Sequence, residues 1–251
     1  MSNPPAIRRV RHETKLRRLN VEHVERLTPK MVRVALGGDD LRGFTSLGFD
    51  DHVKLMLPAV DEVKPQMRDY TPRRHDAHSG RLLIDFVIHD AGAATAWAAS
   101  AAQGQSLGVG GPRGSFVIPT ELDGHLLIGD ETALPAIGRR LEELPASTRA
   151  LVVAEVDNET ERLTFESASK FDVVWVYRRG AEPGSADGLL KALRGLTFPS
   201  GQYFAWAAAE SRVARAVRQY LVGERNADKH WVKAAGYWQR GATGRHDKID
   251  D

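Results

Sequence analysis

The stretch 126–137, Leu126-Leu127-Ile128-Gly129-Asp130-Glu131-Thr132-Ala133-Leu134-Pro135-Ala136-Ile137, joins an apolar run to a helical pattern through one short turn. The apolar run predicts a buried strand over His125–Ile128, and the residues after Gly129 predict a helix from about Thr132 to Leu144. Strand-to-helix turns of this kind are typical of doubly wound α/β folds, which bind ligands at the carboxyl ends of their strands. A standard glycine fingerprint for dinucleotides is absent. Asp130 and Glu131 are expected to cap the helix and to weaken pyrophosphate binding there.

The same alternation continues toward the C-terminus. Further strands are predicted at Ala150–Val156, Phe171–Tyr177, Gln202–Ala208 and His230–Ala234, with helices near Ala186–Arg194 and over Glu210–Gly223. Strands that alternate with helices predict a parallel sheet covered by helices. We therefore expect an α/β domain over residues 121–240, followed by a mobile polar tail over residues 241–251.

The chain before Pro119 has a different texture. Short strand-like pieces separated by Gly, Pro and Asp lie at Val21–Leu27, Met31–Leu36, His52–Leu57, Leu82–Ile88 and Gln105–Val109, with one helical pattern at Ala93–Ala102. Such a series predicts a small antiparallel barrel over residues 1–120. The run Gly108–Ser115 is too rich in glycine for a strand interior, so its backbone should turn sharply or closely approach a neighbour. The predicted fold is therefore an N-terminal antiparallel β-barrel followed by a C-terminal doubly wound α/β domain.

The composition of the chain excludes several classes of protein. The chain has 251 residues, 42% of them hydrophobic, with 35 Lys+Arg against 33 Asp+Glu, a net charge of +2 that does not favour nucleic-acid binding. The absence of cysteine excludes disulfides, thiolate zinc sites, iron–sulfur clusters and a cysteine nucleophile. No histidine pattern predicts a metal site, and no Gly-x-Ser-x-Gly elbow predicts a serine hydrolase. Without a signal-like or membrane-length apolar run, we expect a cytoplasmic protein with no membrane insertion.

Three segments are candidates for binding a ligand. Arg68-Asp69-Tyr70-Thr71-Pro72-Arg73-Arg74 combines guanidinium forks that suit phosphate with a ring and a hydroxyl that suit a flat heterocycle, although a solvated turn also explains this composition. Gly92 leaves the start of the next helix accessible to an anion, as many ordinary helix starts do. The pair Tyr237-Trp238 either lies over a flat cofactor or covers the edge of the sheet.

The order of the motifs is more specific than any one of them. In sequence they are Arg68-x-Tyr70-Thr71-x-Arg73, Phe86-Val87-Ile88-His89, Trp97-Ala98, Gly111-Pro112-Arg113-Gly114-Ser115, Gly129–Ile137 and Gly236-Tyr237-Trp238. This series resembles the siderophore-interacting protein family, a branch of the ferredoxin–NADP reductase-like flavoproteins, from about Val21 to Arg240. The resemblance implies reduction of ferric siderophores, with electrons from NADH, NADPH or a reduced ferredoxin reaching Fe(III) through FAD. A flavin suits this reaction because it converts two-electron donation into one-electron transfer.

The resemblance also implies a role for particular residues. Arg68 would bind the FAD diphosphate, and Tyr70 and Thr71 would lie against the ring and the ribityl chain. The flavin itself would carry the catalysis, and the other implied cofactor-binding residues are Arg73, Val87, His89, Ala93, Ala94, Trp97 and Trp238, with Gly129, Thr132 and Pro135 at the nicotinamide diphosphate. One departure from the family pattern is that Ala93 follows Gly92 where a Gly-Pro pair is usual, and the interval from His89 to Trp97 is one residue shorter.

Two features of the expected reaction are left open by the sequence. Glu155 and Asp157 favour NADH, whereas Arg162, Arg178 and Arg179 favour NADPH. Ferric siderophores are large and often anionic, so a basic substrate cleft is expected. We place it over the exposed flavin face, between the Lys54 region and the segment 237–240, with Lys54, Lys233 and Arg240 as candidate cations. The alternatives are a flavin or ferredoxin reductase that has no siderophore substrate, and a siderophore binder without enzymatic activity.

Overall fold

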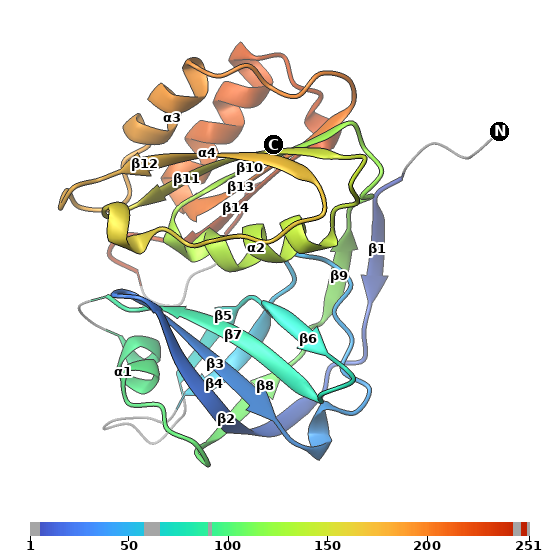
Figure 1. Cartoon of the computed structure of the whole chain (residues 1–251), viewed down its shortest axis with the longest axis vertical. Helices are drawn as coiled ribbons and strands as arrows, with labels where there is room; N and C mark the ends of the chain where they lie inside the picture. The colour runs from blue at the N-terminus through green and yellow to red at the C-terminus, as the bar shows by residue number, and fades with distance from the viewer. Residues whose placement is uncertain (1–5, 58–65, 90–91, 243–246, 250–251) are drawn as a thin grey trace. The chain divides into compact units, whose positions relative to one another are not determined.

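The computed structural model describes residues 6–57, 66–89, 92–242 and 247–249. The chain divides into two compact units, Met1–Pro119 and Thr120–Asp251, and Figure 1 shows the elements of each. The first is built on antiparallel strands and the second on a parallel sheet with helices, so the predicted fold class is confirmed.

The first unit is a seven-stranded antiparallel sheet in the order β5-β4-β8-β2-β3-β7-β6. Its strands are β2 (Leu16–Thr28), β3 (Met31–Gly37), β4 (Val53–Leu57), β5 (Gln66–Tyr70), β6 (Arg74–Asp76), β7 (Arg81–Val87) and β8 (Ser106–Gly110). A separate ribbon pairs β1 (Arg8–Arg11) with β9 (Gly114–Val117), and the helix α1 spans Ala93–Ala99. One short 3-10 turn, η1 (Asp39–Leu41), follows β3.

The two outer strands of this sheet show that it curls. In a flat sheet β5 and β6 would lie roughly 29 Å apart, six spacings of about 4.8 Å. The chain connects them through only Thr71, Pro72 and Arg73, and four residue steps span at most about 14 Å. The sheet must therefore close on itself, which gives the predicted barrel. Its interior is filled by alternating apolar side chains, and Trp97 from α1 belongs to this core.

The second unit has the sheet order β12-β11-β10-β13-β14-β15. The parallel strands are β10 (Gly124–Gly129), β11 (Arg149–Val156), β12 (Lys170–Tyr177), β13 (Tyr203–Glu210) and β14 (Val232–Trp238), while β15 (Asp247–Ile249) is antiparallel to β14. The helix α2 (Leu134–Glu143) covers one face, and α3 (Asp187–Arg194) and α4 (Ser211–Gln219, extended by a π-helical turn, Tyr220–Glu224) cover the other (Figure 1). Successive strands leave the central β10 in opposite directions, so the strand order reverses there.

Several local predictions need correction. Gly108 and Gly110 lie inside β8, because a Cβ at Gly108 would approach the Met56 side chain to 3.1 Å and glycine keeps the two strands close. The last parallel strand begins at Val232, after a 3-10 turn over Lys229–Trp231, and continues through Trp238. The aromatic pair 237–238 therefore belongs to this strand. The predicted tail also differs, since residues 247–249 extend the sheet as β15.

Candidate functional site

The motif at the end of β5 is part of an aromatic cluster. The Tyr70 ring centroid lies 4.5 Å from that of Phe86 on β7, and the Phe86 centroid lies 5.4 Å from that of Trp97 on α1. Phe86 is fully buried, which fixes the position of the Tyr70 ring beside it. Burial raises the pKa of Tyr70, against the opposing effect of the Arg68 charge, so its hydroxyl stays protonated at physiological pH.

Arg68 lies on the same face of β5 as Tyr70, two residues earlier. Its guanidinium donates to Gln66 Oε1 at 2.6 Å and to the Met67 carbonyl at 2.9 Å, and both acceptors are neutral. Across the described part of the chain, no carboxylate forms an ion pair with this side chain. Thr71 is buried, and its hydroxyl makes no hydrogen bond to any described residue. A guanidinium that pairs with no described carboxylate, a hydroxyl with no described hydrogen-bond partner and a ring in a fixed position fit the diphosphate and the ring of FAD.

Arg73 has a different environment. Arg33 on β3 forms a bidentate ion pair with Asp85 on β7, at 2.7 and 2.8 Å, and Arg73 Nε lies 3.9 Å from Asp85 Oδ2. The Asp85 side chain is fully buried, so it needs these cations. The structure therefore places Arg73, one of the predicted cofactor ligands, in the ion network of the barrel wall.

The remaining predicted flavin residues follow β7. Val87 ends that strand, and the backbone N–H of the exposed His89 donates a long hydrogen bond to Thr95 Oγ1, at 3.4 Å. Gly92 has φ +134°, and a Cβ there would lie 3.2 Å from His89 Cε1. Ala94 and Trp97 on α1 pack into the barrel core, and Ala93 is half-buried beside it. Residues 90 and 91 of the shortened interval lie outside the described residues.

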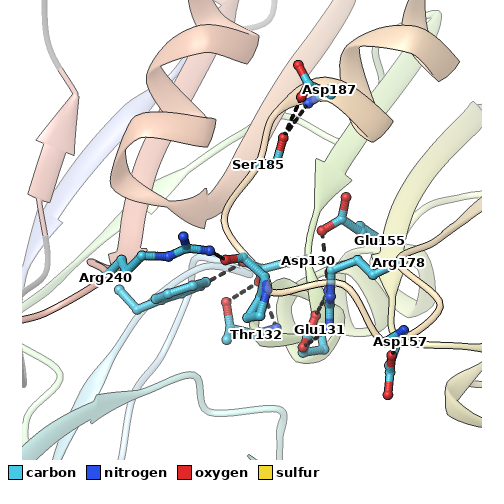
Figure 2. A network of polar contacts seen from close by, with 12 residues as sticks. Asp130, Glu131, Thr132, Glu155, Asp157, Arg178, Ser185, Asp187 and Arg240 are labelled. Atoms are coloured by element: carbon cyan, nitrogen blue, oxygen red, sulfur yellow. Dashed lines mark hydrogen bonds and ion pairs between the residues drawn. The ribbon is translucent and has the colours of Figure 1, made fainter.

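In the second unit, the turn after β10 is organised by Asp130. The Asp130 carboxylate accepts from the Thr132 backbone N–H at 2.9 Å and from the Thr132 hydroxyl at 2.5 Å through Oδ1, and from Trp238 Nε1 at 2.7 Å through Oδ2. Figure 2 shows Asp130 and Thr132 within this network. Burial, with a smaller contribution from Glu131, raises the pKa of Asp130 to about 7.

Gly129 and Pro135 have structural reasons for their positions beside Asp130. A Cβ at Gly129 would lie 2.3 Å from Ala133 Cβ and 2.4 Å from the Ala208 carbonyl oxygen, so glycine permits the close packing of this turn on β13. Pro135 is buried in the first turn of α2, where its missing N–H costs nothing. The predicted nicotinamide residues therefore lie together at the carboxyl end of β10.

A second network at this edge accounts for Arg178. Its guanidinium forms a bidentate pair with Glu131 at 2.6 and 2.7 Å and lies 3.3 Å from Glu155 Oε1 (Figure 2). Burial opposes the charge of Arg178, but the bonds to Glu131 and Glu155 outweigh it and raise the pKa of Arg178. The charge of Arg178, a residue expected to favour NADPH, is thus already compensated by two carboxylates. Arg179, by contrast, is 76% exposed, with one Glu159 contact at 4.0 Å.

The candidate substrate cations are divided between the two units. Lys54 belongs to the first unit and pairs with Asp69 at 2.8 Å. Lys233, which is half-buried on β14, and the exposed Arg240 belong to the second. Arg240 donates to the Pro183 carbonyl, and its backbone N lies 3.4 Å from Glu210 Oε1.

The comparisons with known proteins divide the chain as its structure does. A model for the siderophore-interacting FAD-binding domain matches residues 20–62 and 59–116, and a model for the siderophore-interacting protein matches residues 122–241. The NADPH-dependent ferric-chelate reductase of Escherichia coli K12 is 34% identical over 259 residues, which cover 95% of this chain and 99% of that protein. The chain belongs to the siderophore-interacting protein family. Its first unit is the FAD-binding domain of that family, so the predicted resemblance and cofactor are confirmed.

Other members of the family are similar along most of the chain. A siderophore utilization protein from T. fusca is 39% identical, with a TM-score of 0.90 over 96% of this chain and 98% of that one. Ferric vibriobactin reductase from Vibrio cholerae is 30% identical, covering 86% of each chain. Ferredoxin–NADP+ reductase from Plasmodium falciparum, at 12% identity and a TM-score of 0.66 over 86% of this chain and 94% of that one, shows the shared fold.

Two parts of the site in this siderophore-interacting protein were not predicted from sequence. The Arg33–Asp85 pair depends on the register of β3 and β7, in which these residues are directly opposite. The bond from Trp238 to Asp130 depends on β14 lying beside β13, two strands from β10. For the Arg33–Asp85 pair, the one available signal in the sequence was a charged residue, Asp85, within the apolar run 82–88. Among the described residues, no helix is long and apolar enough to cross a membrane, and no group of three acidic or histidine side chains is placed to hold a metal ion.

Proposed function

We propose that this protein reduces ferric siderophores in an FAD-dependent reaction and thereby releases Fe(II). The observation that carries the proposal is the set formed by Arg68, Tyr70 and Thr71, which fits FAD within a unit that matches the family's FAD-binding domain. The named relatives support the reaction, because they are ferric-chelate, ferric vibriobactin and ferric acinetobactin reductases. FAD supplies the conversion of a two-electron donor into one-electron reduction of the chelated iron.

The residues of the first unit then act as binding and orienting groups. Arg68 binds the diphosphate, and it breaks no ion pair with a described residue to do so. The Tyr70 ring, held against Phe86, orients the flavin, and the Thr71 hydroxyl bonds a polar atom of the cofactor. We assign Val87, His89, Ala93 and Ala94 to the rim of the site. Trp97 and Arg73 support it from the core and from the wall, respectively.

We further propose that NADPH is the electron donor and that it binds at the carboxyl end of β10. Gly129, Thr132 and Pro135 lie there, at the reversal of strand order where doubly wound sheets bind nucleotides. The donor of the Escherichia coli relative supports this choice. A reduced ferredoxin is the second candidate, favoured by the carboxylates of Asp130 and Glu131 at the position where a nucleotide diphosphate would bind.

Substrate recognition by cations stays a proposal. Ferric siderophores that carry negative charge would be attracted to Lys54, Lys233 and Arg240, with Trp238 near the last of these. Lys54 already pairs with Asp69, so exchanging that partner for substrate would cost part of the attraction. The cytoplasmic location expected from the sequence likewise stays a prediction.

The test measures Fe(II) directly. The purified protein, with its flavin identified by absorbance and mass, is mixed anaerobically with a ferric siderophore, a donor and a chromogenic Fe(II) chelator. Fe(II) formation with NADPH or reduced ferredoxin supports the proposal and identifies the donor. A flavin that is reduced but delivers no electrons to any ferric siderophore would identify a general flavin reductase. Tight siderophore binding by a protein that takes up no FAD would identify a binder without this activity.

A further inference from the structure

The backbone donors at the start of the helix after β10 already have an acceptor. In doubly wound folds, the anionic part of a nucleotide binds to such donors at this point. Here the N–H and the hydroxyl of Thr132 both donate to Asp130 Oδ1, at 2.9 and 2.5 Å. Trp238 Nε1 donates to Asp130 Oδ2 at 2.7 Å and holds the carboxylate in this position. The Asp130 carboxylate thus accepts the hydrogen bonds that a phosphate oxygen would otherwise accept from Thr132.

The charges around Asp130 do not offset its own. Glu131 is its neighbour and is bonded to Arg178, which also contacts Glu155 (Figure 2). On the side of β13 and β14 lie the carboxylate of Glu210 and the guanidinium of Arg240, near Trp238 and Gly184. Arg178 is therefore neutralised by two carboxylates, and a diphosphate at Thr132 would meet the negative charge of Asp130 in a poorly hydrated site. Like charges in such a site favour the neutral form of one group.

We propose that Asp130 sets the affinity of this protein for its nicotinamide donor, because its carboxylate competes with the nucleotide diphosphate for the N–H and hydroxyl of Thr132. Protonation of Asp130 removes this competition. The inference rests on the proposed use of a nucleotide donor and adds the residue that regulates it. Burial and Glu131 raise the pKa of Asp130 to about 7, so the competing form becomes less populated as the pH falls through neutrality. Nucleotide binding takes up this proton, and above pH 7 affinity falls by up to about tenfold per pH unit.

The experiment is a calorimetric titration of the FAD-loaded protein with NADP+ at pH 6, 7 and 8. Oxidised nucleotide is used so that no electron transfer accompanies binding. Asp130→Asn is expected to bind NADP+ up to about tenfold more tightly than wild type at pH 8 and similarly at pH 6. The titration of NADP+ itself is common to both proteins and cancels in the comparison.

Glu210→Gln is the matched control. Glu210 caps α4 as Asp130 caps its own turn, accepting from the N–H groups of Arg212 at 2.6 Å and Val213 at 3.2 Å, but it is the last residue of the neighbouring strand, β13. This variant should keep the affinity and pH profile of wild type. Trp238→Phe is a second variant. It removes a hydrogen bond that favours the Asp130 carboxylate, so the pKa of Asp130 should rise and the loss of affinity should begin at a higher pH. Circular dichroism checks that each variant is folded.

Three results would overturn the inference: equal pH profiles for wild type and Asp130→Asn, an equal gain in affinity from Glu210→Gln, or no NADP+ binding by either protein at any pH. Its failure differs from failure of the proposed reaction. Protein reduced with dithionite that still forms Fe(II) from a ferric siderophore keeps the reductase function even where Asp130 has no effect on NADP+. If Asp130→Asn changes NADP+ binding as expected but no Fe(II) forms, the inference about Asp130 is supported and the proposed reductase function is refuted.

Discussion

Replacing Arg68 by Gln tests the site on which the functional proposal depends. The side chain donates to two neutral acceptors, Gln66 Oε1 and the Met67 carbonyl, so binding a phosphate breaks no ion pair with a described residue. A hydrogen bond to a charged group contributes about 1.5–3 kcal/mol, which corresponds to a rise in the dissociation constant of FAD of about tenfold to about 150-fold. The barrel should stay folded, because the guanidinium is only half-buried and carries no structural ion pair among the described residues.

The assay is a calorimetric titration of deflavinated protein with FAD. Lys54→Gln is its control, since it removes a cation from β4, the neighbouring strand, that is 38% exposed and already paired with Asp69. Exposed pairs of this kind contribute at most about 1 kcal/mol, so this variant should bind FAD within about fivefold of wild type. An Arg68→Gln protein that binds FAD as tightly as wild type, or a Lys54→Gln protein that loses as much affinity, would refute the assignment of Arg68 to the diphosphate.

Three further predictions concern stability. Gly129→Ala should lower the free energy of unfolding by about 1–3 kcal/mol in a urea titration, because the new Cβ would overlap Ala133, and an unchanged midpoint would contradict the close packing. Asp85→Asn should cost about 3–5 kcal/mol in the same assay by breaking a buried pair with Arg33, and a loss below about 1 kcal/mol would show that the network is unimportant. Burial lowers the pKa of His125 to about 3, so the unfolded chain takes up a proton before the folded one as the pH falls. The free energy of unfolding should therefore decrease as the pH drops from 6.5 toward 3. His125→Leu should flatten this dependence, which calorimetry at several pH values can measure.

The sequence predicted those features that depend on local patterning. Apolar runs such as Leu82–Ile88 and Phe171–Tyr177 became strands within one residue of their predicted bounds, because hydrophobic periodicity directly reflects burial. The alternation of strands and helices after Pro119 likewise predicted the parallel sheet. The assignment of the motif Arg68-x-Tyr70-Thr71 to FAD stays a prediction, made because its residue types match the chemistry of a phosphate and a flat ring.

Features that depend on long-range register were not predictable from the sequence. Asp85 is buried because Arg33 lies opposite it, and Oδ2 of Asp130 has a donor because Trp238, 108 residues later in the chain, reaches it. The strands β1 and β9 were missed because each is four residues long and rich in polar residues or glycine. The predicted strand at Gln105–Val109 stopped before Gly110 because of the low strand propensity of glycine, although Gly110 lies in β8, where it packs against Met56.

The short strand β15 determines how the second unit ends at its outer edge. It pairs Ala234, Ala235 and Gly236 of β14 with Ile249, Lys248 and Asp247, and the Ile249 side chain is buried in the core beside α4. A protein truncated after Ala242 would present the backbone of β14 as an unpaired template, bordered by small apolar side chains. Exposed templates of this kind recruit strands from other copies, so the truncated protein should self-associate and aggregate where the full chain does not. The last residues thus protect the molecule from its own copies, and an expression tag or deletion at this end would act on solubility before it acted on chemistry.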